Sequence, residues 1–202
     1  MRNRFALVAA VASLAMLLAR PTLSRADTST EIDHVVMVAL ERLYATVPAA
    51  KALGEKAKAV LVFPSVLKGG LLVGGSYGEG ALVRDGKPAD YYATASVTFG
   101  AQAGAQTYGY ALMLMTEDAL DYLYSTSGWQ LGTGPTVVFI DSGGAASLTN
   151  QTARSDVYAF TFDPKGLMFG LNLEGSKITR IVPDDKSFVA AGTPSPAPRS
   201  RD

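Results

Sequence analysis

The apolar residues between positions 31 and 44 repeat with the period of an α-helix. They share one helix face at spacings of three and four residues: Ile32, Val35, Val36, Ala39, Leu40 and Leu43. Ser29 or Thr30 can cap the start of this helix, and the acidic Glu31 and Asp33 in its first turn favour the helix dipole. The pattern therefore predicts a helix over Glu31–Tyr44.

From Ala59 onward apolar and polar residues alternate, which indicates β-strands. The predicted strands are Ala59–Phe63, Leu71–Gly74, Gly80–Arg84, Tyr91–Phe99, Gly104–Met115, Thr136–Ile140, Asp156–Phe162 and Leu167–Leu173. A second short helix over Ala49–Ala57 precedes them, because Pro48 suits a first helical position.

Two turns and one further helix interrupt the predicted strands. Asp85-Gly86 and Asp163-Pro164-Lys165-Gly166 have the composition of tight turns. Thr116 is the expected N-cap of a helix that ends at Gly128. Strands joined mainly by hairpins indicate an α+β fold: an antiparallel, curled or barrel-like β-sheet with the N-terminal helices and the inserted helix packed on it.

Glycine is concentrated between two of these strands. Six of the thirteen residues of Lys68–Gly80 are glycine. An ordered domain retains so many glycines only where the backbone needs positive φ or where another group approaches closely. We expect Gly74, Gly75, Gly78 and Gly80 to be needed for the fold before any ligand.

The first 26 residues have the pattern of a secretory signal peptide. Arg2 and Arg4 precede the apolar run Phe5–Ala19, and Ser24-Arg25-Ala26 fits a cleavage site. The run has 15 residues, whereas a membrane span needs about 20, so a retained anchor is the less favoured alternative. The predicted organisation is a signal peptide (1–26), one domain (27–191) and a disordered tail rich in Pro, Ser and Arg (192–202).

Removal of the signal peptide changes the charge balance. It takes away four arginines and no acid, so 14 basic residues remain against 18 acidic ones, a net charge of −4. A mildly acidic domain argues against nucleic-acid binding, which calls for a basic footprint. We expect an exported protein of the periplasm or cell envelope of a bacterium.

The residues do not combine into a catalytic or metal-binding set. Gly74-Gly75-Ser76-Tyr77-Gly78 matches the G-x-S-x-G pattern of serine hydrolases, but a strand follows it instead of a helix. The only histidine, His34, lies upstream on the first helix, and the chain has no cysteine. We therefore expect no enzymatic activity, no metal site and no cofactor.

Three ordered blocks resemble the SYLF domain family. They are Ala57–Pro64 with Lys68-Gly69-Gly70 and Gly74–Gly80, then Phe99–Gln106, then Lys165–Ser176. The resemblance runs from roughly Leu40 to Ile181. It implies membrane-lipid binding, which in eukaryotic members involves phosphoinositides, an amphipathic N-terminal segment and nearby basic residues.

Some members of that family are associated with actin, which an exported chain would not meet. The first predicted helix carries mostly acidic residues on its polar side, whereas membrane-surface helices carry Lys and Arg, so its apolar stripe is expected to be core. The leading hypothesis is an exported, non-enzymatic domain that binds anionic or phosphorylated lipid head groups. The alternative is a structural or assembly protein of the cell envelope that binds a protein partner.

The candidate lipid-binding residues lie before and within the glycine segment. They are four lysines and two hydroxyl residues: Lys51, Lys56, Lys58, Lys68, Ser76 and Tyr77. A scattered, solvated set of lysines is the alternative interpretation. Four further basic residues would join the patch if the fold brings them near: Arg84, Lys87, Lys165 and Lys177.

Overall fold

The computed structural model describes residues 28–126, 128–140, 155–166 and 175–183. The helices and strands of this part are α2 (Ser29–Thr46), α3 (Pro48–Gly54), β1 (Ala59–Arg84), β2 (Lys87–Leu114), α4 (Glu117–Ser125), β3 (Trp129–Gln130), β4 (Val137–Ile140), β5 (Val157–Gly166) and β6 (Lys177–Ile181). The predicted signal peptide (1–26), the predicted tail (192–202) and the predicted strand Leu167–Leu173 lie outside the described residues.

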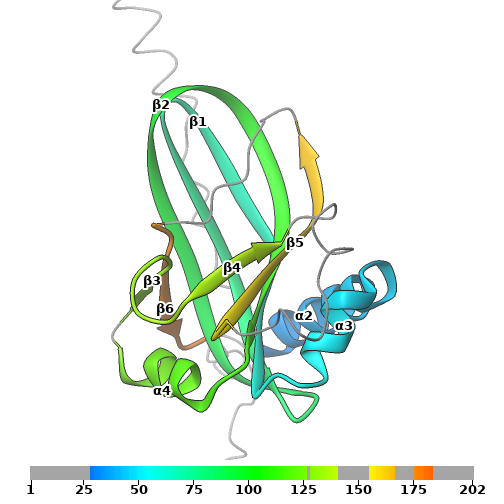
Figure 1. The fold of residues 1–202 in the computed structure, drawn as a ribbon. Coiled ribbons are helices and arrows are strands. Elements are labelled where there is room, and N and C mark those ends of the chain that lie inside the picture. The colour runs from blue at the N-terminus through cyan, green and yellow to red at the C-terminus, as the bar shows by residue number, and fades with distance from the viewer. Residues whose placement is uncertain (1–27, 127, 141–154, 167–174, 184–202) are drawn as a thin grey trace, which may run out of the picture.

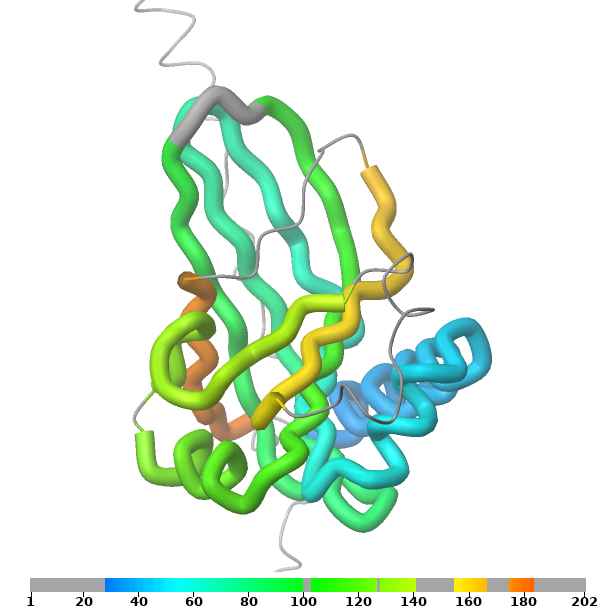
Figure 2. Tube along the Cα trace, in the orientation of Figure 1, coloured from blue at the N-terminus to red at the C-terminus, as the bar shows by residue number. Residues whose placement is uncertain are grey.

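β1 and β2 form one long antiparallel ribbon that bends back on itself (Figures 1 and 2). The pairing runs from Ala59 opposite Leu114 to Arg84 opposite Lys87, with a register shift between Leu71 and Val73. The chain reverses there and brings two segments of β1 close together. A Cβ on Gly70 would lie only 2.3 Å from the Cα of Gly74.

We name the parts of this ribbon as follows. The first arm comprises residues 59–71 of β1 and 103–114 of β2, and the second arm comprises residues 73–84 and 87–99. The end at the bend is the tip, and the opposite end is the base. Asp85-Gly86 joins the two strands at the base, as the sequence predicts, with both residues at positive φ.

The remaining strands extend the sheet from both arms of β2. β5 pairs with the first arm and β6 with the second, both antiparallel. β4 then pairs with β5 in parallel, and β3 pairs with β6 antiparallel. The predicted α+β class with a curled, mostly antiparallel sheet is thus confirmed, and the parallel β4–β5 pair is an addition to it.

Alternate residues of β1 enter two different hydrophobic cores. Leu61 and Phe63 pack with Tyr110 between the arms, whereas Val60 and Val62 pack against α2 and α3 on the other face. The period-two pattern of a strand that is covered on both sides explains this division. The apolar stripe of α2 fills the second core with Ile32, Val36, Ala39, Leu40 and Leu43, so the expectation that it is core is confirmed except at Val35, which is exposed.

The helix caps follow from local sequence. α2 begins at Ser29, two residues earlier than expected, and its N-cap is Thr28 instead of Ser29 or Thr30, because Thr28 and Glu31 form a capping box. The Thr116 hydroxyl accepts a hydrogen bond from the backbone N–H of Ala119 at 3.2 Å, which confirms it as the N-cap of α4. That helix ends at Ser125, three residues before Gly128.

Two glycines of the second arm allow the first arm to approach closely. A Cβ on Gly80 would lie 2.0 Å from the carbonyl oxygen of Val62, and one on Gly78 would lie 2.7 Å from that of Ser65. Neither distance can accommodate a side chain without movement of the backbone. At these two positions the space around the backbone agrees with a structural role for the glycines.

Three predictions of strand boundaries are wrong. The two strands expected over Tyr91–Phe99 and Gly104–Met115 are one strand, β2. The three strands expected between Ala59 and Arg84 are one strand. Pro64 has no N–H to donate to the neighbouring strand, and it falls at a register shift, where this hydrogen bond is not needed. The predicted turn Asp163-Pro164-Lys165-Gly166 is part of β5. A shift in the β2–β5 register and the positive φ of Asp163 mark a bulge there. A bulge uses the same residue types as a turn, but the strand continues through it.

Candidate functional site

A groove of about 570 Å³ lies between α2 and β1. α2 contributes Val35 and Val38, which the core does not cover, and β1 contributes Leu67 and Tyr77. The apolar stripe of α2 is therefore wider than its core contacts need. The groove offers an apolar floor that is open to solvent.

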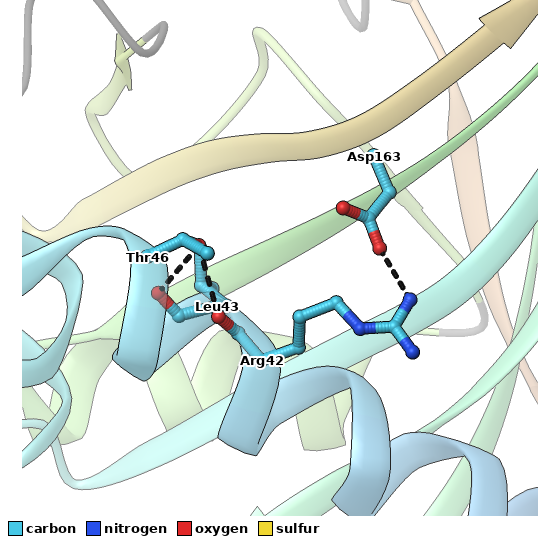
Figure 3. A network of polar contacts seen from close by, with 4 residues as sticks. All are labelled: Arg42, Leu43, Thr46 and Asp163. Atoms are coloured by element: carbon cyan, nitrogen blue, oxygen red, sulfur yellow. Dashed lines mark hydrogen bonds and ion pairs between the residues drawn. The ribbon is translucent and has the colours of Figure 1, made fainter.

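The polar rim of this groove is held by an ion pair. The Arg42 guanidinium contacts the Asp163 carboxylate at 2.7 Å, which links α2 to the bulge of β5 (Figure 3). On the opposite side the Tyr77 hydroxyl donates to the Glu79 carboxylate at 2.5 Å. The carboxylates of Asp163 and Glu79 offset the charge of Arg42, so the rim has no cationic excess with which to attract an anionic head group.

The structure does not bring the four predicted lysines together. Lys51 lies on α3 beside Glu55 (3.9 Å), and Lys58 at the base contacts Glu117 on α4 at 3.0 Å. Lys56 is exposed between them in the turn after α3. Lys68 is far along the first arm, ten residues or about 33 Å of strand from Lys58, and only 6% exposed.

Ser76 and Tyr77 lie next to each other in the second arm but face opposite sides. The Ser76 hydroxyl is within 2.7 Å of the Ser96 hydroxyl and also reaches Tyr108, so it connects the two arms from inside. The Tyr77 side chain is exposed on the groove. Ser76 makes a structural contact here. It lies within a strand, whereas the serine of a G-x-S-x-G hydrolase motif lies on a sharp turn between a strand and a helix.

A buried column of hydroxyl groups continues this contact between the arms. The Tyr110 hydroxyl donates to the Thr94 hydroxyl at 2.7 Å, and burial raises the pKa of Tyr110. Burial and the nearby Asp90 raise the pKa of Tyr92 to about 12. Both tyrosines remain neutral at physiological pH. The Tyr110 hydroxyl links the two arms, whereas Tyr92 contributes its ring to the core between them.

Sequence reasoning missed an exposed apolar surface at the bend. We call it the ribbon tip: Leu71, Leu72, Val73, Val97 and Phe99. One sequence signal marks it, namely the absence of any charged residue between Lys68 and Glu79 and between Asp90 and Glu117. The strand periodicity alone predicts that these apolar residues are buried in the core, which explains why the exposed surface was missed.

The described residues contain neither a spanning helix nor a metal cluster. No helix in the described ranges is both long and apolar enough to cross a bilayer. Over the same ranges, no group of three or more His, Asp or Glu side chains gathers with the geometry of a metal site.

Comparison with known proteins gives one family. Residues 95–190 match the family model Ysc84, described as Las17-binding protein actin regulator. No curated protein matches the chain. The matched segment begins in the second arm of the ribbon and runs through β5 and β6.

Proposed function

We propose that this chain is an exported, non-enzymatic domain that binds lipid at a membrane surface. The match of residues 95–190 to the Ysc84 model, which describes the SYLF domain, assigns the chain to the SYLF domain family, and this family is known for lipid binding. We further propose that it prefers anionic or phosphorylated head groups and acts in the periplasm or cell envelope of a bacterium. The placement of Ser76 within a strand and of His34 on α2 supports a role other than catalysis.

The observation that carries this proposal is the distribution of exposed apolar side chains. Seven of the large apolar residues that remain exposed lie on β1 and β2 between the groove and the bend: Leu67, Leu71, Leu72, Val73, Tyr77, Val97 and Phe99. Single exposed apolar residues are ordinary, whereas a contiguous group marks a contact surface. A lipid-binding domain needs such a surface.

Vesicle co-sedimentation tests the proposal. The chain that begins at Asp27 keeps every described residue and lacks the apolar run Phe5–Ala19, which would itself bind vesicles. We expect it to sediment with phosphatidylcholine vesicles that contain phosphatidylglycerol, and much less with phosphatidylcholine alone. A net charge of −4 repels an anionic surface, so only basic residues within about a Debye length (~8 Å) of the bilayer can provide the attraction.

The outcome also separates the alternative function. Absence of binding to both vesicle types would refute lipid binding and leave a structural or assembly protein of the envelope as the better explanation. The family description names an actin regulator, so co-sedimentation with actin filaments is the matching control, and we expect none.

Export is tested independently of binding. We expect the protein recovered from the cell envelope to begin at Asp27 by mass spectrometry, because Ser24-Arg25-Ala26 fits the cleavage pattern. A chain that still begins at Met1 in the membrane fraction would show that residues 1–26 act as an anchor.

A further inference from the structure

We propose that the ribbon tip inserts into the hydrocarbon of an anionic bilayer while Lys165 and Lys177 contact the head groups around it. This inference rests on the proposed lipid-binding function and assigns it a mode of contact. It places the bilayer at the bend of the ribbon, far from the lysines of α3 and the base.

The tip is exposed to an extent that folding does not explain. The exposed fractions are 72% for Leu71, 67% for Leu72, 55% for Val73, 68% for Val97 and 80% for Phe99. Four of them belong to the last few pairs of the ribbon on either side of the bend, and Leu72 lies at the register shift between these pairs. They therefore lie together at the end of the ribbon where β1 and β2 bend, and Figure 1 shows this bend at one end of the fold.

Leu72 gives independent support. Its φ is +67°, a left-handed conformation that glycine or asparagine adopts at much lower cost than leucine. A leucine that is both strained and exposed contributes nothing evident to the folded state. Its apolar side chain is explained if it has a partner outside this chain.

The surroundings of the tip suit hydrocarbon rather than water. Within the described residues, the tip half of the ribbon carries no charged side chain except Lys68, which is buried. A charge near the bilayer centre is strongly disfavoured, so its absence is required of an inserting segment. β1 and β2 are hydrogen-bonded to one another up to Leu71–Ala103 and Val73–Phe99, which limits the unpaired backbone that would enter the lipid.

Two exposed lysines flank the tip from the neighbouring strands. Lys177 of β6 is opposite Ala95, four residues from Phe99, and Lys165 of β5 is opposite Thr107, four residues from Ala103. Four residues of strand span about 13 Å. The end of the Lys177 side chain lies against Gly128, beside Thr179, and would turn toward the tip on binding. An apolar segment that enters by 5–10 Å would then place both lysines at roughly the phosphate level, where basic residues attract anionic lipid.

Among the described residues, the acidic side chains lie farther from the tip than these lysines. Glu79 is opposite Ala93, two residues nearer the base than the pair of Tyr77 with Ala95. Asp163 precedes Lys165 by two residues along β5. The order along the ribbon is thus apolar, then basic, then acidic, which complements a bilayer with anionic head groups.

The absence of cysteine from the chain allows a position-specific test of insertion. We would label Val97→Cys at the tip and Ala89→Cys at the base with the fluorophore NBD, and add phosphatidylcholine–phosphatidylglycerol vesicles. We expect a blue shift and quenching by doxyl-labelled lipid for position 97 only. Vesicle binding with an unchanged probe at position 97 would overturn the insertion and leave lipid binding intact, whereas no vesicle binding at all would overturn both.

A substitution with opposite effects on folding and binding separates the tip from the fold. We expect Leu72→Asn to leave the Tm unchanged or higher, because asparagine tolerates positive φ, and to weaken vesicle binding by about tenfold or more. The control is Val182→Asn, which removes an apolar side chain that is 91% exposed next to β6, away from the tip. Equal loss of binding in both variants, or none in Leu72→Asn, would contradict the proposal.

The lysines can be ranked in the same assay. We expect Lys165→Gln and Lys177→Gln each to weaken binding to anionic vesicles by about fivefold, with the loss disappearing at high salt. Lys51→Gln and Lys56→Gln are the matched controls on and after α3, and we expect them to bind as the wild type does. The reverse ranking would place the bilayer at the base of the ribbon and refute insertion of the tip.

Discussion

The base and the tip of the ribbon are built from the same two strands, yet their surroundings differ. At the base both faces of β1 and β2 are covered, so that Leu61 and Leu112 are fully buried, and charged residues surround the covered region. At the tip the apolar residues continue, but no described element covers them, and β1 and β2 carry no exposed charge beside them. Apolar alternation in a strand therefore predicts a surface that is buried against another surface. It does not indicate whether that other surface belongs to the same chain.

This comparison separates folding from contact with a partner. The free energy of folding is concentrated at the base, where side chains lose their contact with water. The tip buries little, so its residues can change with a small effect on stability. Substitutions at the two ends should thus differ in size and, at one position, in sign.

The largest loss of stability is expected where the two arms touch. Gly80→Ala would place a Cβ 2.0 Å from the Val62 carbonyl oxygen, so one backbone has to move, and we expect the free energy of unfolding to fall by about 3 kcal/mol. Gly69→Ala is the matched control, because its nearest atom would be 3.7 Å away. Urea denaturation compares the two, and equal stability of both variants would show that the arms are less tightly packed than described.

How far the sequence predicts this molecule depends on the kind of signal. The stripe of α2 and the cap at Thr116 are local signals, and both predict the structure correctly. Pro64 and the glycines of β1 signal a break in the chain, but the strand continues through them because its partner β2 accommodates the shifts in register. Long-range pairing overrides local propensity at such positions.

The candidate site was harder to predict for a similar reason. Proximity in sequence suggested one patch of Lys51, Lys56, Lys58 and Lys68, whereas the extended first arm places Lys68 about 33 Å of strand away from the base. The flanking lysines of the tip come from β5 and β6, far away in sequence. Only the pairing of the strands places them beside the bend.

The next largest effect concerns the hydroxyl column between the arms. Tyr110→Phe removes the donor to Thr94 and leaves a buried hydroxyl without its partner, so we expect a loss of about 1–3 kcal/mol in the free energy of unfolding. Tyr92→Phe is the control, since its buried hydroxyl has no hydrogen-bond partner among the described residues, and we expect no loss. Thermal melts of both variants provide the measurement. A larger loss of stability in Tyr92→Phe than in Tyr110→Phe would contradict the assignment of the stabilising hydrogen bond to Tyr110.

A smaller effect of opposite sign is expected at the tip. Leu72→Asn relieves the positive φ, and we expect the free energy of unfolding to rise by about 0.5 kcal/mol. Leu72→Val keeps an apolar side chain but is β-branched, so it should be about 1 kcal/mol less stable than the asparagine variant. Destabilisation by asparagine would show that the leucine side chain supports the bend.

The smallest effect is expected at the rim of the groove, between the base and the tip. Arg42 and Asp163 are both largely exposed, with side-chain fractions of 55% and 37%, so their ion pair is screened by water. A double-mutant cycle of Arg42→Gln and Asp163→Asn should give a coupling of about 0.2–1 kcal/mol that shrinks in 1 M salt. The pair of Arg180 with Asp90 is the comparison, because the Asp90 side chain is only 16% exposed and its coupling should be larger. If the Arg42 pair proved the stronger of the two, the groove would be a rigid part of the fold, and its apolar floor would be less open to rearrangement on a membrane.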